Sequence, residues 1–216
     1  MNENFQELKD EILSRAKSVM ACKEQYGRAY RAESLEELMQ VVKDNFLWAC
    51  NHKIITLKLI EQYRKAFASC DIRANEDVSS GYLLCVNSSV VARNNAYVVA
   101  YGSASVDAWN YVSVHAFEKV SVNAWDYTSV IANDYVTVNG FDYASVIAMG
   151  NAFVEAFDNS SVVADGTPSV CGWNFAVVSS WRKLKNVVLR NCAIYQVESE
   201  DTIYYSSDDI KFVKQL

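Results

Sequence analysis

A repeat of eight residues runs from Ser88 to about Ser180, and it constrains the fold more than any other feature of this chain. Each unit contains a valine, followed two residues later by a small residue. The valines are Val90, Val98, Val106, Val114, Val122, Val130, Val138, Val146, Val154, Val162, Val170 and Val178. The small residues are Ala92, Ala100, Ala108, Ala116, Ala124, Ala132, Gly140, Ala148, Ala156, Ala164, Gly172 and Ser180. A short, fixed period over half of a chain is typical of a solenoid.

Residues 104–111 illustrate one unit of the repeat. Side chains alternate along a strand, so Ala104, Val106 and Ala108 share one face, and we predict that they form the core. The residue two positions after the small one is usually of a type that tolerates turn geometry. These turn residues are Asn94, Gly102, Asn110, Glu118, Asp126, Asp134, Asp142, Gly150, Asp158, Gly166 and Asn174. Each unit is therefore predicted to be a strand of about five residues followed by a tight corner.

Alternate units differ, which indicates that one structural coil contains two units, or sixteen residues. The outward position after the valine is polar in one set: Asp107, Asn123, Asn139 and Glu155. In the other set it is mostly apolar: Val99, His115, Ile131, Ile147 and Val163. We therefore predict an α+β protein whose main body is a two-sheet β-solenoid, or β-helix, of about six such coils. Because its core side chains are short, function must lie on the outer surfaces or the flanking segments.

The segments beside the repeat predict caps. Apolar residues recur at helical spacing over residues 5–19, and a capping box at residues 34–37 begins a second helix that extends to about residue 48. A third helix is expected from about residue 53 to residue 68. The predicted domains are a three-helix head or cap over residues 1–80, the solenoid over residues 81–185 and a short C-terminal cap over residues 186–216. Asn186 replaces an expected valine, so we expect a few irregular strands in this last segment.

Charge limits the classes of partner. The chain has a net charge of −6, and residues 81–180 contain eight acidic and two basic side chains. Nucleic-acid backbones are bound by clustered Lys and Arg, so we expect no direct sequence-specific DNA binding. Most of the acidic side chains occupy predicted turn positions, which explains them without a partner, although they could also meet a basic protein.

The sequence also predicts the compartment and the redox state of the thiols. Its first residues lack a basic segment followed by an apolar run, and no stretch is long enough to cross a bilayer, so we expect a cytoplasmic protein without a membrane partner. Six cysteines are scattered without CxxC pairs, which favours reduced thiols in an unexported protein. Cys50 and His52 lack the close ligand pairs of structural zinc sites, so we expect neither a metal nor a cofactor.

The sequence contains no recognisable catalytic signature. Only His52 and His115 could act as histidine bases, and they lie in different predicted domains. Left-handed β-helix acyltransferases have a six-residue repeat, whereas this repeat has eight residues. Calcium-binding Gly-Gly-x-Gly-x-Asp repeats, a nucleophile elbow and a glycine-rich phosphate loop are all absent. We therefore expect a protein that is not an enzyme, and an enzyme with an unrecognised site remains an alternative.

Two outer surfaces are candidates for binding a partner. The first is an aromatic edge at the corners: Trp109, Tyr111, Trp125, Tyr127, Phe141 and Tyr143. Rows of Trp and Tyr anchor partners, but stacking that stiffens the corners explains the pattern equally well. The second is the apolar strip already named, Val99, His115, Ile131, Ile147 and Val163, which is flanked by serines. Such a strip indicates a homodimer, a different partner or a docking site for the helical head.

The chain resembles a group of accessory proteins encoded by phages and mobile elements. The residues that carry the resemblance are Ala16-Lys17, Ala21-Cys22 and the segment YRAESLEEL at residues 30–38, followed by the Ala-Ser-Val-x-Ala octads. This resemblance covers most of the chain and carries over no functional residues. It implies a small protein that acts on the machinery of a bacterial host, such as an inhibitor of a CRISPR-type defence nuclease.

Together these observations predict a non-catalytic protein-binding module in the cytoplasm of a bacterial host cell, with a host protein or ribonucleoprotein as its partner. A rigid repeat surface loses little conformational entropy when it binds, which favours this use. The alternative is a virion- or tail-associated structural or assembly protein that forms homo-oligomers through its apolar face.

Overall fold

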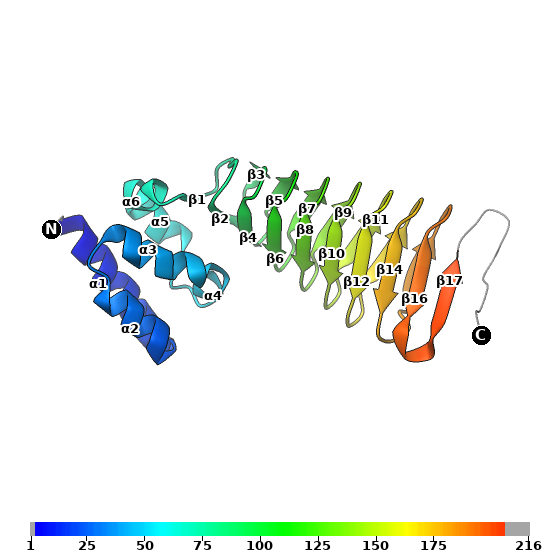
Figure 1. Ribbon diagram of the computed structural model, residues 1–216, viewed down its shortest axis with the longest axis horizontal. Helices are drawn as coiled ribbons and strands as arrows, with labels where there is room; N and C mark the ends of the chain where they lie inside the picture. The colour runs from blue at the N-terminus through cyan, green and yellow to red at the C-terminus, as the bar shows by residue number, and fades with distance from the viewer. Residues whose placement is uncertain (1–2, 206–216) are drawn as a thin grey trace.

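The computed structural model describes residues 3–205 and shows an elongated molecule, with helices at one end and a stack of strands along the rest (Figure 1). The described part contains six α-helices, all of which precede the strands. They are α1 (Glu3–Ser18), α2 (Lys23–Arg31), α3 (Leu35–Asp44), α4 (Phe46–Asn51), α5 (Leu57–Gln62) and α6 (Arg64–Ser69). The strands wind into a two-sheet β-solenoid, so the predicted architecture is confirmed.

Successive strands alternate between the two sheets. The ten-stranded sheet A contains β1 (Ile72–Ala74), β2 (Tyr82–Val86), β4 (Tyr97–Tyr101), β6 (Ser113–Ala116), β8 (Ser129–Ala132), β10 (Ser145–Ala148), β12 (Ser161–Ala164), β14 (Val177–Ser180), β16 (Ile194–Val197) and β17 (Thr202–Tyr205). The seven-stranded sheet B contains β3 (Ser89–Ala92), β5 (Ser105–Ala108), β7 (Ser121–Ala124), β9 (Thr137–Gly140), β11 (Phe153–Ala156), β13 (Ser169–Gly172) and β15 (Asn186–Leu189). Seven strands in sheet B correspond to about seven coils, one more than predicted.

The core is built from the predicted valine and small-residue positions. In β8, Val130 and Ala132 are fully buried, and they lie level with Val146 and Ala148 of β10, one coil further along. Neighbouring coils pair in parallel at this sixteen-residue offset, because the repeat places identical side chains in the same register. The core between the two sheets is a continuous cluster of valine and alanine side chains.

The corners have the backbone geometry that the turn residues predict. Every residue of the predicted turn column has a positive φ, from 55° at Asn94 to 90° at Gly166. Glycine adopts this left-handed region freely, and Asn and Asp tolerate it better than other residues. The recurrence of these three residue types, with Glu118 at 64° as the one exception in the column, therefore closes the coils at the predicted places.

The prediction of three helices in the head is wrong, because the described head contains six. Ser34 caps α3 as expected, since its Oγ accepts a hydrogen bond from the backbone N–H of Glu37 at 3.2 Å. The expected long second helix, however, breaks at Asn45, whose side chain donates to the carbonyl oxygen of Val41 at 2.8 Å. The third breaks at Tyr63, between α5 and α6. Helix α2 was not predicted because its nine residues are mostly polar or charged and include a glycine, and Ala29 is its only buried residue.

The predicted domain boundaries also shift. Strand β1 begins the solenoid inside the segment assigned to the head, and β15 and β16 continue it inside the segment assigned to the C-terminal cap. Val187 pairs with Val170, seventeen residues earlier, so one extra residue in the preceding corner displaces the expected valine from position 186. Strand β17 is antiparallel to β16 and ends the described solenoid. Residues 206–216 of the predicted cap lie outside the described residues.

The helical head packs on the outer face of sheet A at the first coils. The Phe46 ring of α4 lies edge-on to Tyr82 and Tyr97, with centroids 5.2 and 6.3 Å away. Leu84 and Val99, which point outward from sheet A, belong to the buried core of the head. The head therefore covers the start of one face and leaves the later coils of that face uncovered.

Candidate functional site

The structure joins parts of the two predicted surfaces on one face of the solenoid. From the corner into each sheet A strand, outward residues alternate with buried core residues: Tyr111 in the corner, and Ser113 and His115 on β6, are separated by the buried Val112 and Val114. The same arrangement recurs every sixteen residues. We call the set the sheet A face: Tyr111, Tyr127, Tyr143, Ser113, Ser129, Ser145, Ser161, His115, Ile131, Ile147 and Val163. The i, i+2 spacing of Tyr111, Ser113 and His115 across the corner is the sequence signal for this union.

The exposed part of this face lies beyond the head. Ile147 is 40% exposed and Val163 is 51% exposed, whereas Val99, in the same column, is completely buried by the head. The predicted strip is therefore divided: its first residue is the docking site of the head, and its later residues face outward. Val99 cannot contact a partner while the head is in place.

Tyrosine rings form one border of the sheet A face. Tyr111, Tyr127 and Tyr143 are each more than half exposed, and their rings stack one coil apart with centroids 5.3 and 5.2 Å from each other. Parallel stacking holds these rings at fixed positions, so their exposed edges and hydroxyl groups can meet a partner without further ordering.

The other aromatic column belongs to the outer side of sheet B. Trp109 and Trp125 stack with centroids 3.9 Å apart and planes 7° from parallel. The stack continues beyond Phe141, where the predicted edge ended, and Arg190 lies over its last ring at 4.8 Å. The complete column is Trp109, Trp125, Phe141, Phe157 and Trp173. This close stacking favours the structural interpretation of the column, since each ring covers the face of the next.

The acidic turn residues bond to neighbouring coils. Asp126 Oδ2 accepts from the backbone N–H of Asn110 at 3.1 Å, and Asp134 Oδ2 accepts from that of Glu118 at 3.0 Å. Glu118 in turn accepts from the N–H of Gly102 at 2.8 Å. These carboxylates satisfy backbone donors at the corners, which accounts for their recurrence without a basic partner.

His115 lies beside Tyr97, the sheet A residue on which Phe46 of the head packs. Its ring is half-buried, with its centroid 5.3 Å from that of Tyr97, and burial lowers the pKa of His115 below its ordinary value of 6.5. Because burial disfavours the charged imidazolium, the folded protein takes up this proton at lower pH than the unfolded chain.

Acidification is therefore expected to destabilise the protein through His115. The stabilising effect of the neutral ring is complete above the unfolded pKa of 6.5 and is lost as the pH falls below it. The melting temperature of the wild type should fall more between about pH 7.5 and pH 5 than that of His115→Gln, which cannot titrate. Parallel melting curves measured by circular dichroism test this, and an equal fall in both proteins would contradict it.

The described residues show no assembled catalytic or metal centre. His52 directly follows α4, and its Nδ1 lies 2.9 Å from the carbonyl oxygen of Trp48, while His115 is on sheet A. Burial raises the pKa of the Cys50 thiol to about 12 and that of Cys85 to about 11, so both thiols stay protonated. Within residues 3–205 no group of three or more His, Cys, Asp or Glu residues is placed to hold a metal ion. No helix in this range is long and apolar enough to cross a membrane.

The sheet A face is the strongest candidate site in the described structure, because it combines exposed apolar side chains with hydroxyl groups in a fixed array. No protein-family model, curated protein or solved structure matches the chain.

Proposed function

We propose that this protein is a non-catalytic protein-binding module that presents the sheet A face to a bacterial host protein or ribonucleoprotein. On the resemblance to phage accessory proteins, the partner is a component of a defence system such as a CRISPR-type nuclease, which the bound protein inhibits. The observation that supports this most is the outward Tyr–Ser–Ile array, repeated in register over the two consecutive coils that contain β8 and β10.

The composition of this surface suits a protein partner. The outward residues of two consecutive coils are Tyr127, Ser129 and Ile131, then Tyr143, Ser145 and Ile147, and none of them is charged. Interface centres are depleted in charge and enriched in aromatic residues. Backbone ladders fix each strand to its neighbours on both sides, so little conformational entropy is lost when a partner binds.

A double substitution on this face tests the proposal. Tyr143→Ala with Ile147→Arg removes a ring and places a charge in the array, and we expect inhibition to weaken at least about tenfold, as for loss of an interface anchor. The readout is plasmid interference in bacterial strains that each carry one defence nuclease, followed by cleavage assays with the purified nuclease that responds.

Ser121→Arg is the matched control, because it adds the same charge to the outer side of sheet B. It should inhibit like the wild type. If no nuclease responds to the wild type, the protein is not an inhibitor of these nucleases. If the double variant keeps full inhibition with an unchanged melting temperature, the sheet A face is not the inhibitory surface.

A second candidate is a virion- or tail-associated structural protein that assembles through the same face. The exposed Ile147 and Val163 favour this, because a flat apolar surface can pair with a second copy about a two-fold axis. Light scattering after size exclusion separates the candidates. A homodimer that dissociates in Ile147→Asp supports assembly, whereas a monomer that inhibits a nuclease supports the first proposal.

A further inference from the structure

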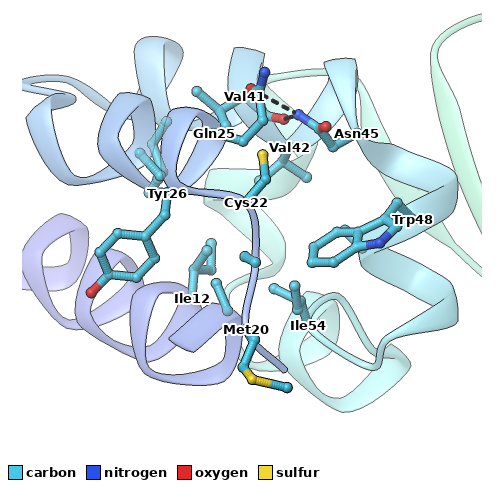
Figure 2. Close-up of a pocket in the computed structure, with 15 residues that line it drawn as sticks. Ile12, Met20, Cys22, Gln25, Tyr26, Val41, Val42, Asn45, Trp48 and Ile54 are labelled. Carbon is cyan, nitrogen blue, oxygen red and sulfur yellow. Dashed lines mark hydrogen bonds between the residues drawn. The ribbon is translucent and has the colours of Figure 1, made fainter. Parts of the chain in front are cut away.

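The helical head contains an open pocket of about 400 Å³ between α1, α2, α3 and α4 (Figure 2). Its walls include Ile12, Ala29, Val42, Trp48 and Ile54. Pockets for small molecules have volumes of roughly 300–1,000 Å³ and mostly apolar walls, so both the size and the lining fit such a ligand.

Two amide side chains lie together at one end of the pocket. Figure 2 shows the side chains of Gln25 and Asn45 there, and Asn45 Nδ2 donates to Gln25 Oε1 at 3.2 Å. Asn45 also donates to the carbonyl oxygen of Val41 at 2.8 Å. Amide groups at the end of an apolar cavity can orient a ligand by one or two hydrogen bonds, while the walls supply most of the contact.

The lining carries no charge among the described residues: it contains no Asp, Glu, Lys, Arg or His. The nearest cation to the amide pair is Arg28, which donates to Gln25 Oε1 at 2.8 Å and to Asp44 Oδ2 at 2.7 Å. The Arg28 charge is therefore already balanced by a carboxylate. A charged ligand would lose its hydration in this pocket and gain no opposite charge, which is strongly unfavourable.

Met20 lies at the mouth of the pocket in an unusual setting. It follows α1 with a φ of 55°, at a position where helices commonly end in glycine, and its side chain is 89% exposed. Trp48 lines the pocket on another side (Figure 2). A methionine side chain is flexible and contacts aromatic groups favourably, so Met20 can change rotamer and cover a bound ring.

We infer that this pocket binds an uncharged, apolar small molecule, with an aromatic or short hydrocarbon body between Ile12, Ala29 and Trp48 and one polar group at the Gln25–Asn45 amides. Apolar cavities with such walls bind neutral aromatic molecules, because the ligand makes van der Waals contacts with the walls that water does not make. The site is separate from the sheet A face, so this inference does not rest on the proposed function.

The test uses two fluorescent probes with related ring systems, N-phenyl-1-naphthylamine, which is neutral, and anilinonaphthalene sulfonate, which is an anion. The neutral probe should bind the full chain at one site and quench Trp48 by energy transfer, and the anion should bind at least about tenfold more weakly. Equal affinity for both probes, or no saturable binding of the neutral one, would overturn the inference.

Variants locate the binding in the pocket. Ala29→Leu fills part of the cavity and should weaken binding of the neutral probe at least about tenfold, whereas Ala66→Leu adds the same volume on α6, outside the pocket, and should leave it unchanged. Trp48→Phe keeps the ring surface and should retain binding while reducing the energy transfer. Circular dichroism confirms that each variant is folded, and unchanged binding in a folded Ala29→Leu variant would overturn the inference.

Discussion

Replacing Val138 with aspartate is expected to unfold the middle of the solenoid. Val138 is fully buried in β9, and its neighbours Val122 and Val154 in the adjacent coils are equally buried. A carboxyl group at this position would be surrounded by apolar side chains and would lose its hydration. The free energy of unfolding should therefore fall by at least about 4 kcal/mol, whether the group is charged or protonated. Since each coil contacts only its neighbours, a defect in β9 divides the stack.

Thr137→Asp is the matched control for this substitution. Thr137 precedes Val138 on the same strand, and its side chain points to the outer side of sheet B. The same carboxyl group should therefore cost less than about 1 kcal/mol at this position. Chemical denaturation followed by far-UV circular dichroism compares the two variants, and similar unfolding midpoints would contradict the assignment of Val138 to the core.

Gly81→Ala is expected to destabilise the junction between the head and the solenoid. Gly81 has a φ of 81°, and a Cβ atom there would lie 2.4 Å from the carbonyl oxygen of Asp71. That oxygen is backbone and also accepts from the N–H of Tyr82 at 2.8 Å, so it cannot move without loss of this hydrogen bond. The left-handed conformation and the steric clash together should lower the free energy of unfolding by about 3 kcal/mol.

Gly27→Ala provides the contrast. Gly27 lies inside α2, and its added Cβ would meet only the flexible guanidinium group of Arg31, at 3.3 Å. Alanine inside a helix is favoured over glycine by about 1 kcal/mol, so this variant should be as stable as the wild type or more stable. The urea midpoint of Gly81→Ala should therefore fall, whereas that of Gly27→Ala should stay the same or rise. An unchanged midpoint in Gly81→Ala would show that Gly81 is not conformationally required.

The solenoid could be predicted in detail because its period repeats local information. Val106 and Ala108 identify the inner face, and Asn110 identifies the corner. The same pattern recurs every eight residues, so that two units complete one coil of sixteen residues. The prediction failed only where the period is interrupted. One extra residue before Val187 ended the visible repeat, although parallel pairing with Val170 continues after it.

The head was harder to predict because its helices are short and depend on tertiary contacts. The side chain of Asn45 bonds to Val41 and to Gln25 of another helix, and this double contact accompanies the break between α3 and α4. The pocket beside these residues was not predicted, since its walls come from four helices whose packing no local pattern specifies.

The candidate site, too, could be predicted from the sequence only in part. The sequence by itself determined which residues point outward from the strands, because alternation along a strand and a sixteen-residue coil place Tyr127, Ile131 and Ile147 outside the core. Only the tertiary structure decided which of these outward residues are free to bind. The head buries Val99 while Ile147 and Val163 remain exposed, and that outcome depends on long-range packing of Phe46 against Tyr82 and Tyr97 rather than on the repeat.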